Sequence, residues 1–181
     1  MVVSGLSAGG TIAAWVGQYR ADVHRVVLVA PALEVTHVPS LLHGAVLRIA
    51  LRVPNVTRAS PRDSSEPDRM PGWATRAVAQ TLKLGVAVRK SAAEHAAAVK
   101  EVAVLLNAHD HTIANGAAID LARSWERHGA VTRIYVLPDS LQLPHDVIDP
   151  RHSGSNVAAV YPVLDSLIAG AHPTGLVAAM R

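Results

Sequence analysis

The stretch Gly5-Leu6-Ser7-Ala8-Gly9-Gly10 decides how the rest of the chain is interpreted. It follows the apolar residues 1–3 and precedes the helix-like run 11–20, so the local order is strand, tight turn, helix. This is the context of a G-x-S-x-G nucleophile elbow, in which a serine stands in a strained turn with its hydroxyl exposed. Flanking glycines let the neighbouring segments approach without a clash at Cβ. The following helix points N–H groups and the positive end of its dipole at the same place, which suits an oxyanion.

Two other interpretations of this stretch are open at this point. Glycine and serine also cluster in ordinary strand-to-helix turns. A phosphate-binding loop is conceivable as well, but the lysine of G-x-x-x-x-G-K-[ST] is absent. The elbow interpretation therefore depends on partners for Ser7 further along the chain.

The amino-acid composition excludes several kinds of site and partner. The 181 residues suffice for one domain with a sizeable core, and they are 50% hydrophobic and 17% charged. Without cysteine there are no disulfides and no thiolate metal sites. The net charge of +3 comes from scattered arginines, and only 3% of the residues are aromatic, so we expect no nucleic-acid partner. With neither a secretory signal nor a bilayer-spanning run, we expect a cytoplasmic protein without stable membrane insertion.

Strand-like and helix-like runs alternate along the chain, which predicts an α/β fold with a mostly parallel sheet flanked by helices. Continuous apolar, β-branched runs are typical of strands that are buried on both faces. After the first strand, the predicted strands are 25–33, 102–107 and 131–137, and helices are predicted at 115–128 and 157–169.

The segment between the second and third predicted strands is longer than a strand-helix-strand connection needs. It carries helical patterns at 38–53 and 74–89, separated by a polar, Pro-rich loop. We interpret it as a helical cap over an active site; an ordinary crossover and an amphipathic membrane-surface helix at 38–53 are the alternatives. The predicted domains are a core, 1–36 and 99–181, and a cap, 37–98.

Three residues that follow predicted strands carry the chemistry. Ser7 follows the first strand, Asp110 the third and His145 the fourth. Functional groups gather at the carboxyl ends of the strands in an open α/β sheet, and the chain order Ser, Asp, His is that of the α/β-hydrolases. A neutral imidazole of His145 can take the serine proton, and Asp110 would hold the other ring N–H. The N–H of Ala8 would be one oxyanion-hole donor.

These residues have alternative roles. Asp110 could cap the following helix, although Asn115 is better placed to do so. His109 and His111 flank it and are candidate metal ligands, but they point to the opposite side of an extended segment from Asp110, and the local ligand spacing of metal sites is missing. His145, Asp146, Asp149 and His152 form the best alternative metal cluster, but Asp146 and Asp149 are more typical of loop and cap residues, and no metal is expected.

Four segments together resemble the α/β-hydrolase superfamily, in particular its serine esterase, lipase and lysophospholipase-like branch. They are GLSAGG, VVLVAPAL, NAHDHTIAN and LPHDVIDP, and the resemblance extends over nearly the whole chain. It implies that Ser7 is the nucleophile, Asp110 the acid and His145 the base of a catalytic triad. It also implies that the segment after VVLVAPAL forms the cap.

The function implied by this resemblance is hydrolysis of small-molecule carboxylic esters through an acyl-enzyme, without a cofactor. An apolar acyl pocket is expected under the cap, with Leu6, Leu41 and Leu42 as its substrate-binding residues. Esterases, thioesterases, lipases and acyltransferases share the triad and differ in pocket shape.

One departure from the family pattern is large. In the family the elbow strand is the fifth of eight, whereas this chain starts at it, so the N-terminal half of the sheet and the loop with the second oxyanion donor are absent. A weak or inactive fragment that acts as a binding module is therefore the alternative function. The first strand would also be an exposed sheet edge, through which we expect a homo-oligomer. Two copies paired in this way would restore eight strands.

Overall fold

The computed structural model describes residues 1–36, 38, 43–59 and 72–180, and strands alternate with helices along them. The strands are β1 (Val2–Leu6), β2 (Arg25–Val29), β3 (Thr57–Ala59), β4 (Gly72–Ala74), β5 (Glu101–Asn107), β6 (Val131–Leu137) and β7 (Ala178–Met180). The helices are α1 (Ala8–Tyr19), α2 (His43–Arg52), α3 (Thr75–Glu94), α4 (Asn115–Arg127), α5 (Val157–Ala169) and the short 3-10 helix η2 (Asp139–Leu141).

A five-stranded sheet organises the molecule, with the strand order β1-β2-β5-β6-β7. The first four of these strands run parallel, and β7 pairs with β6 in the antiparallel sense. The predicted α/β fold with a mostly parallel sheet is confirmed. β1 ends the strand order, so the predicted sheet edge is present in the described sheet.

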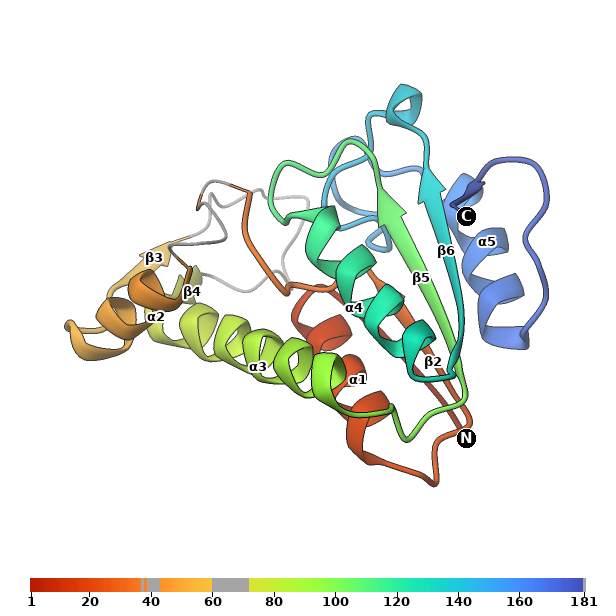
Figure 1. The fold of residues 1–181 in the computed structure, drawn as a ribbon. Helices are drawn as coiled ribbons and strands as arrows, with labels where there is room; N and C mark the ends of the chain where they lie inside the picture. The colour runs from red at the N-terminus through yellow and green to blue at the C-terminus, as the bar shows by residue number, and fades with distance from the viewer. Residues whose placement is uncertain (37, 39–42, 60–71, 181) are drawn as a thin grey trace.

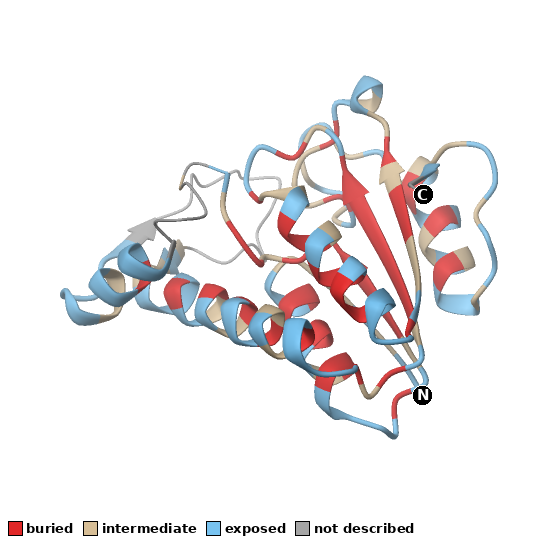
Figure 2. Ribbon diagram, in the orientation of Figure 1, coloured by how far each residue is buried: buried red, intermediate tan, exposed pale blue. Residues whose placement is uncertain are grey.

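Helices cover both faces of this sheet (Figure 1). On one face, α1, α3 and α4 bury side chains against alternate residues of the central strands, among them Val26, Val102 and Val104. On the other face α5 packs against the intervening residues, such as Val27 and Leu105. Figure 2 shows the central strands as buried between the two helical layers. Strands buried on both faces explain why their sequences read as continuous apolar runs.

A buried polar contact ties α1 to α4. The indole Nε1 of Trp125, which is fully buried, donates to Gln18 Oε1 over 2.6 Å. The amide nitrogen of the same glutamine is also bonded, since Gln18 Nε2 donates to the carbonyl oxygen of Ala96 over 3.2 Å. Buried polar groups are stable only when they are bonded in this way. Gln18 therefore fixes the face of α1 that points toward α4.

The segment 37–98 is only partly separate from the core. Its antiparallel pair β3–β4 and helix α2 stand to one side of the sheet in Figure 1. Helix α3 is different, because its C-terminal half places Val88 and Ala92, both fully buried, in the same cluster as α1 and the sheet. The predicted cap, 37–98, is therefore not separate from the core over its whole length, because the C-terminal half of α3 belongs to the core layer.

Two further differences from the sequence-based expectation concern strands. The second strand was expected to reach residue 33, but β2 ends at Val29. The next residue, Ala30, has a φ of 39°, and Pro31 follows it, so the chain turns there. β7 was not expected, and it extends the sheet beyond β6.

Within the described ranges, every helix falls short of the length or the apolar character that a membrane-crossing segment needs. The cytoplasmic location stays a prediction.

Candidate active site

Ser7 stands between the last residue of β1 and the first residue of α1 in a strained backbone conformation. Its φ is 52° and its ψ is −117°, a region that residues with a Cβ rarely adopt. Its N–H donates to Val29 O over 3.0 Å, and its carbonyl oxygen accepts from Thr11 N and Ala32 N at 3.1 and 3.0 Å. The end of β2 and the turn after it therefore hold the serine in place.

The glycines around Ser7 differ in whether there is space for a side chain. A Cβ on Gly5 would overlap the backbone of Gly9. A Cβ on Gly10 would lie 2.9 Å from Pro31 Cα, closer than real contacts allow. A Cβ on Gly9 would meet nothing within 4 Å. Within the G-x-S-x-G pattern, only Gly5 lies where a side chain would clash. The other position where a side chain would clash is Gly10, which lies outside the pattern.

Asp110 lies in the turn after β5 with its carboxyl group fully buried. Its Oδ1 accepts hydrogen bonds from the N–H groups of Thr112 and Ile113, over 2.8 and 3.1 Å, and its Oδ2 contacts His145 Nδ1 at 2.6 Å. Burial is the largest influence and raises the pKa of Asp110. The hydrogen bond and charge of His145 and the two N–H donors outweigh it, so the pKa lies below the ordinary value of 3.8. The carboxylate form is therefore favoured.

His145 lies in the loop after β6 and connects the other two side chains. Its Nε2 is 2.8 Å from Ser7 Oγ, and its Nδ1 is the atom that contacts Asp110. The ring is 19% exposed, whereas Asp110 is covered. The structure thus brings the three predicted residues together, with Ser7 at the accessible end of the series.

Asn107, which the sequence analysis did not single out, joins the two loops of this site. It is the last residue of β5 and is 1% exposed. Its Nδ2 donates to the carbonyl oxygens of Leu143 and Pro144 at 3.0 and 3.1 Å, next to His145. Its Oδ1 accepts from His109 N at 3.1 Å. The only signal for it in the sequence is a polar residue at the end of a strongly apolar strand.

His109, Asp149 and Asn115, which lie near the site, have structural partners. His109 Nδ1 contacts Asp139 Oδ1 at 2.9 Å, and the ring of His111 packs edge-on against His109 at 4.5 Å. The carboxylate of Asp149 pairs with Arg151, whose Nε is 3.2 Å from Asp149 Oδ1. Asn115, expected as a helix cap, instead donates its side-chain N–H to Asn107 O over 2.7 Å. In the part of the chain that the structure describes, no three His, Asp or Glu residues form a metal-ligand cluster.

An apolar cavity of about 420 Å³ opens beside Ser7 and His145. The other described residues that line it are Ala8, Ala32, Val35, Trp73, Val78, Thr81, Leu82, Thr112 and Ile113. They come from the start of α1, the turn after β2, β4, α3 and the turn after β5. None of them is charged, so the cavity suits an uncharged apolar group.

The predicted substrate-binding residues lie differently. Leu6 does not line this cavity; it packs against the core cluster under α5. Leu6 is the last residue of β1, and its side chain lies on the sheet face that α5 covers. Leu41 and Leu42 lie outside the described residues. Among the described residues of the segment 37–98, Trp73 and the first turns of α3 line the cavity.

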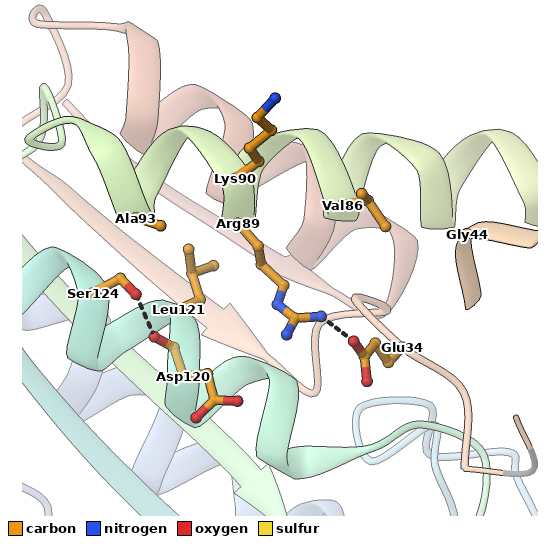
Figure 3. A pocket seen from close by; sticks show the side chains of 9 residues that line it. All are labelled: Glu34, Gly44, Val86, Arg89, Lys90, Ala93, Asp120, Leu121 and Ser124. Carbon is orange, nitrogen blue, oxygen red and sulfur yellow. Dashed lines mark hydrogen bonds and ion pairs between the residues drawn. The ribbon is translucent and has the colours of Figure 1, made fainter. Parts of the chain in front are cut away.

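A second cavity, of about 390 Å³, lies between α3 and α4, away from Ser7 (Figure 3). Arg89 of α3 points across it and forms an ion pair with Glu34, which is 6% exposed. Ser124 donates to the carbonyl oxygen of Asp120 on its floor. The Arg89–Glu34 ion pair crosses this cleft and connects α3 to the turn after β2.

Solved structures of lipolytic enzymes have a similar fold. The monoacylglycerol lipase of Paleococcus ferrophilus aligns with a TM-score of 0.62 at 15% identity, over 93% of this chain and 68% of its own. A soluble variant of the monoglyceride lipase of Saccharomyces cerevisiae gives 0.61 at 12% identity, over 92% and 62%. The structure described for the metagenome-derived lipolytic enzymes LipS and LipT gives 0.58 at 16% identity, over 93% and 63%.

The chain has an α/β-hydrolase fold. No family model and no curated protein matches its sequence. At identities of 12 to 16%, the structural likeness speaks for the fold alone. The chain spans 62 to 68% of the length of those three structures.

The elbow glycines give a matched pair of substitutions. We expect Gly5→Ala to destabilise the α/β-hydrolase fold by about 1–3 kcal/mol or more, since the methyl group would overlap backbone that cannot rotate away. Gly9→Ala, in open space on a helix, should be neutral or stabilising by up to about 1 kcal/mol. Urea unfolding of both variants measures the difference; equal losses would contradict the steric argument.

Asp110 predicts a pH dependence of stability. A carboxyl whose pKa is lower in the folded state stabilises the fold above its ordinary value of 3.8, and this contribution is lost as the pH falls through the folded-state pKa. The stability difference between the unmodified chain and Asp110→Asn should therefore be larger at pH 7 than at pH 2–3. Urea unfolding at both pH values gives this difference, and one that does not change with pH would contradict the lowered pKa.

Asn107 predicts a stability effect at the site. Replacing it with leucine leaves the carbonyl oxygens of Leu143 and Pro144 and the N–H of His109 without this partner. Each buried group left unsatisfied costs about 1–3 kcal/mol, so Asn107→Leu should lower the unfolding free energy by at least that amount. A change below about 0.5 kcal/mol, the usual size for surface substitutions, would show that Asn107 does not hold the loops.

Proposed function

We propose that the chain hydrolyses carboxylic esters through an acyl-enzyme formed on Ser7, with His145 as the base and Asp110 as the acid of the triad. The observation that carries the proposal is the continuous series of contacts from Ser7 Oγ to His145 Nε2, at 2.8 Å, and from His145 Nδ1 to Asp110 Oδ2, at 2.6 Å. A hydroxyl becomes a useful nucleophile when a base is within hydrogen-bond reach and is itself oriented by a third group.

The reaction has two halves. Ser7 Oγ attacks the ester carbonyl carbon while His145 Nε2 takes the hydroxyl proton, and a tetrahedral intermediate forms. His145 gives that proton to the leaving alkoxide, the carbon–oxygen bond breaks, and the acyl group stays on Ser7. In the second half water attacks the acyl-enzyme, His145 takes a proton from it, and the carboxylic acid leaves as Ser7 is protonated again.

Asp110 and Ala8 support the charges that develop. The buried carboxylate of Asp110 accepts from His145 Nδ1, which keeps Nε2 free to act as the base and stabilises the imidazolium. Ala8 is the first residue of α1, and the first N–H groups of a helix have no partner within it. This N–H is proposed as an oxyanion-hole donor, at the positive end of the helix dipole.

The cavity beside Ser7 is the proposed acyl site. Side chains such as Val78, Leu82 and Ile113 would bury an apolar acyl chain, and none of the described lining residues is charged. A neutral, small-molecule ester with an apolar acyl group fits these walls better than an ester with a charged one.

A second candidate function is a binding module that has the α/β-hydrolase fold but little activity. The observation in its favour is that the chain spans 62 to 68% of the length of the three lipolytic structures. The second oxyanion donor that the family resemblance assigns to an earlier loop is worth about 10²–10³ in rate. On this account the triad is retained in geometry but works slowly.

Hydrolysis of p-nitrophenyl esters with short to long acyl chains tests the two candidates. We expect activity that Ser7→Ala lowers by at least about 10⁴-fold in kcat, because the nucleophile is lost. Asp110→Asn should lower kcat by about 10⁴-fold through the wrong imidazole tautomer. Ser4→Ala, an exposed serine on the same strand, is the matched control and should keep full activity.

A fluorophosphonate probe separates a slow enzyme from an inert one. The probe phosphonylates an activated serine whatever the acyl preference, so intact mass spectrometry should find one adduct, absent in Ser7→Ala. A folded chain with neither turnover nor adduct would contradict the hydrolase proposal and favour the binding module.

A further inference from the structure

The ion pair of Glu34 and Arg89 connects two segments that both line the cavity beside Ser7. Figure 3 shows Arg89 reaching from α3 across the neighbouring cleft to Glu34, in the turn after β2. The side chain of Glu34 is 8% exposed, and that of Arg89 is 27% exposed. A carboxylate removed from water to this degree is costly unless a cation stays beside it. The pair therefore favours one position of α3 relative to this turn.

The turn after β2 separates the two cavities. Val35 lines the cavity beside Ser7, whereas the preceding residue, Glu34, lines the cleft between α3 and α4. Neighbouring side chains of an extended segment point to opposite sides, which explains this division. Because the two residues share a peptide unit, a displacement of Glu34 also displaces the cavity wall at Val35.

Backbone contacts hold this turn to the segment that follows Asp110. Val35 forms an isolated antiparallel bridge with Ile113, and Ala114 N donates to Glu34 O over 2.9 Å. Ile113 lines the cavity as well, and its own N–H donates to the carboxylate of Asp110. This wall of the cavity is therefore fixed to the candidate triad by the main chain.

Helix α3 supplies the facing wall and meets the turn through side chains. Leu82, which lines the cavity, is buried in a cluster against which Val35 packs. Gly85 lies so close to Leu33 that a Cβ would come within 3.1 Å of the backbone. Apolar contacts of this kind are non-directional. Arg89, about two turns after Leu82, adds a contact that fixes the position of α3 through charge.

We propose that Glu34 and Arg89 are positioning residues for the acyl group. Their ion pair holds α3 against the turn after β2 at the separation where the cavity encloses an apolar chain. Neither residue is among the described residues that line the cavity, so both act through its walls. The inference rests on the proposed ester hydrolysis at Ser7, and it makes the preference for long acyl chains depend on a charge pair outside the cavity.

The ion pair should affect long acyl chains and not the chemistry at Ser7. The contacts among Ser7, His145 and Asp110 involve no residue of α3. An acetyl group ends beside Ser7 and buries little surface against the helix. A longer chain extends between the walls, and each methylene group that it buries contributes about fourfold to affinity. Without the pair, the preference for long chains should fall while acetate hydrolysis continues.

Kinetics of Arg89→Met measure this preference. The ratio of kcat/KM for p-nitrophenyl decanoate to kcat/KM for the acetate should fall at least about tenfold, through a higher KM for the decanoate, as when two buried methylene groups are lost. The value for the acetate should stay within about twofold. Arg89→Lys keeps a cation and should retain more of the ratio than Arg89→Met.

Lys90→Met is the matched control. It makes a similar exchange at the next residue of α3, and Figure 3 shows the Lys90 side chain pointing away from Glu34. Its ratio of decanoate to acetate hydrolysis should equal that of the unmodified chain. A loss of the ratio in Lys90→Met as large as in Arg89→Met would overturn the inference, because the effect would then come from charge on α3 in general.

Binding of 1-decanol to the Ser7→Ala chain, measured by calorimetry, tests the walls without turnover. The Kd should rise at least about tenfold when Arg89→Met is added, and it should not change with Lys90→Met. A chain that shows this difference but hydrolyses no ester would contradict the proposed function and support the positioning role. Hydrolysis with the same chain-length ratio and the same decanol Kd in a folded Arg89→Met would do the reverse.

Circular dichroism shows whether each variant is folded. If Arg89→Met does not fold, Glu34→Gln replaces it, because glutamine keeps the size of glutamate and removes its charge. The decanoate-to-acetate ratio should then fall, and the decanol Kd rise, by at least about threefold, since charge-assisted hydrogen bonds are about twice as strong as neutral ones. Unchanged values in Glu34→Gln would overturn the inference, and so would equal losses for acetate and decanoate.

Discussion

The geometry of the site depends on the close backbone approach around Ser7. A residue held at a φ of 52° is strained by about 1–3 kcal/mol and keeps that conformation only when its surroundings determine it. Here they do, because the end of β2 and the turn after it bond both the N–H and the carbonyl of Ser7. The contact also requires glycine where α1 crosses β1 and Pro31. The orientation of the serine is therefore a property of the β1–β2 pair and not of a local turn alone.

The opposite side of the site is fixed by the end of β5. Asp110 and His145 are connected twice, once by their own contact and once through Asn107, which bonds the backbone next to each of them. The turn after β2 is joined to the same region, since Ala114 N donates to Glu34 O over 2.9 Å and Thr36 Oγ donates to His111 O over 2.7 Å. The loops that follow β2, β5 and β6 are thus joined to one another by hydrogen bonds around His145.

The parts of the fold that the sequence predicted well are those with a long periodic or continuous apolar pattern. The strand at 131–137 and the helix at 157–169 have the predicted bounds, and each contributes several buried apolar side chains to the core, among them Tyr135 and Leu137 of the strand and Val163 of the helix. The three-residue strands β3, β4 and β7 are too short for any periodicity to mark them. The early end of β2 depends on the positive φ of Ala30, which an apolar pattern does not encode.

The same distinction applies to the candidate site. Ser7, Asp110 and His145 were predicted from chain order and strand ends, whereas Asn107 and Gly10 act through contacts between distant segments.

Helix α3 shows why the position of the cavity could not be predicted from the sequence. Its first turns line the cavity with Val78 and Leu82, and its last turns are buried in the core with Val88 and Ala92. Between them Gly85 lies against Leu33, where a Cβ would come within 3.1 Å of the backbone. The cavity wall is therefore an extension of a core helix, and its position follows from core packing that spans both of the predicted domains.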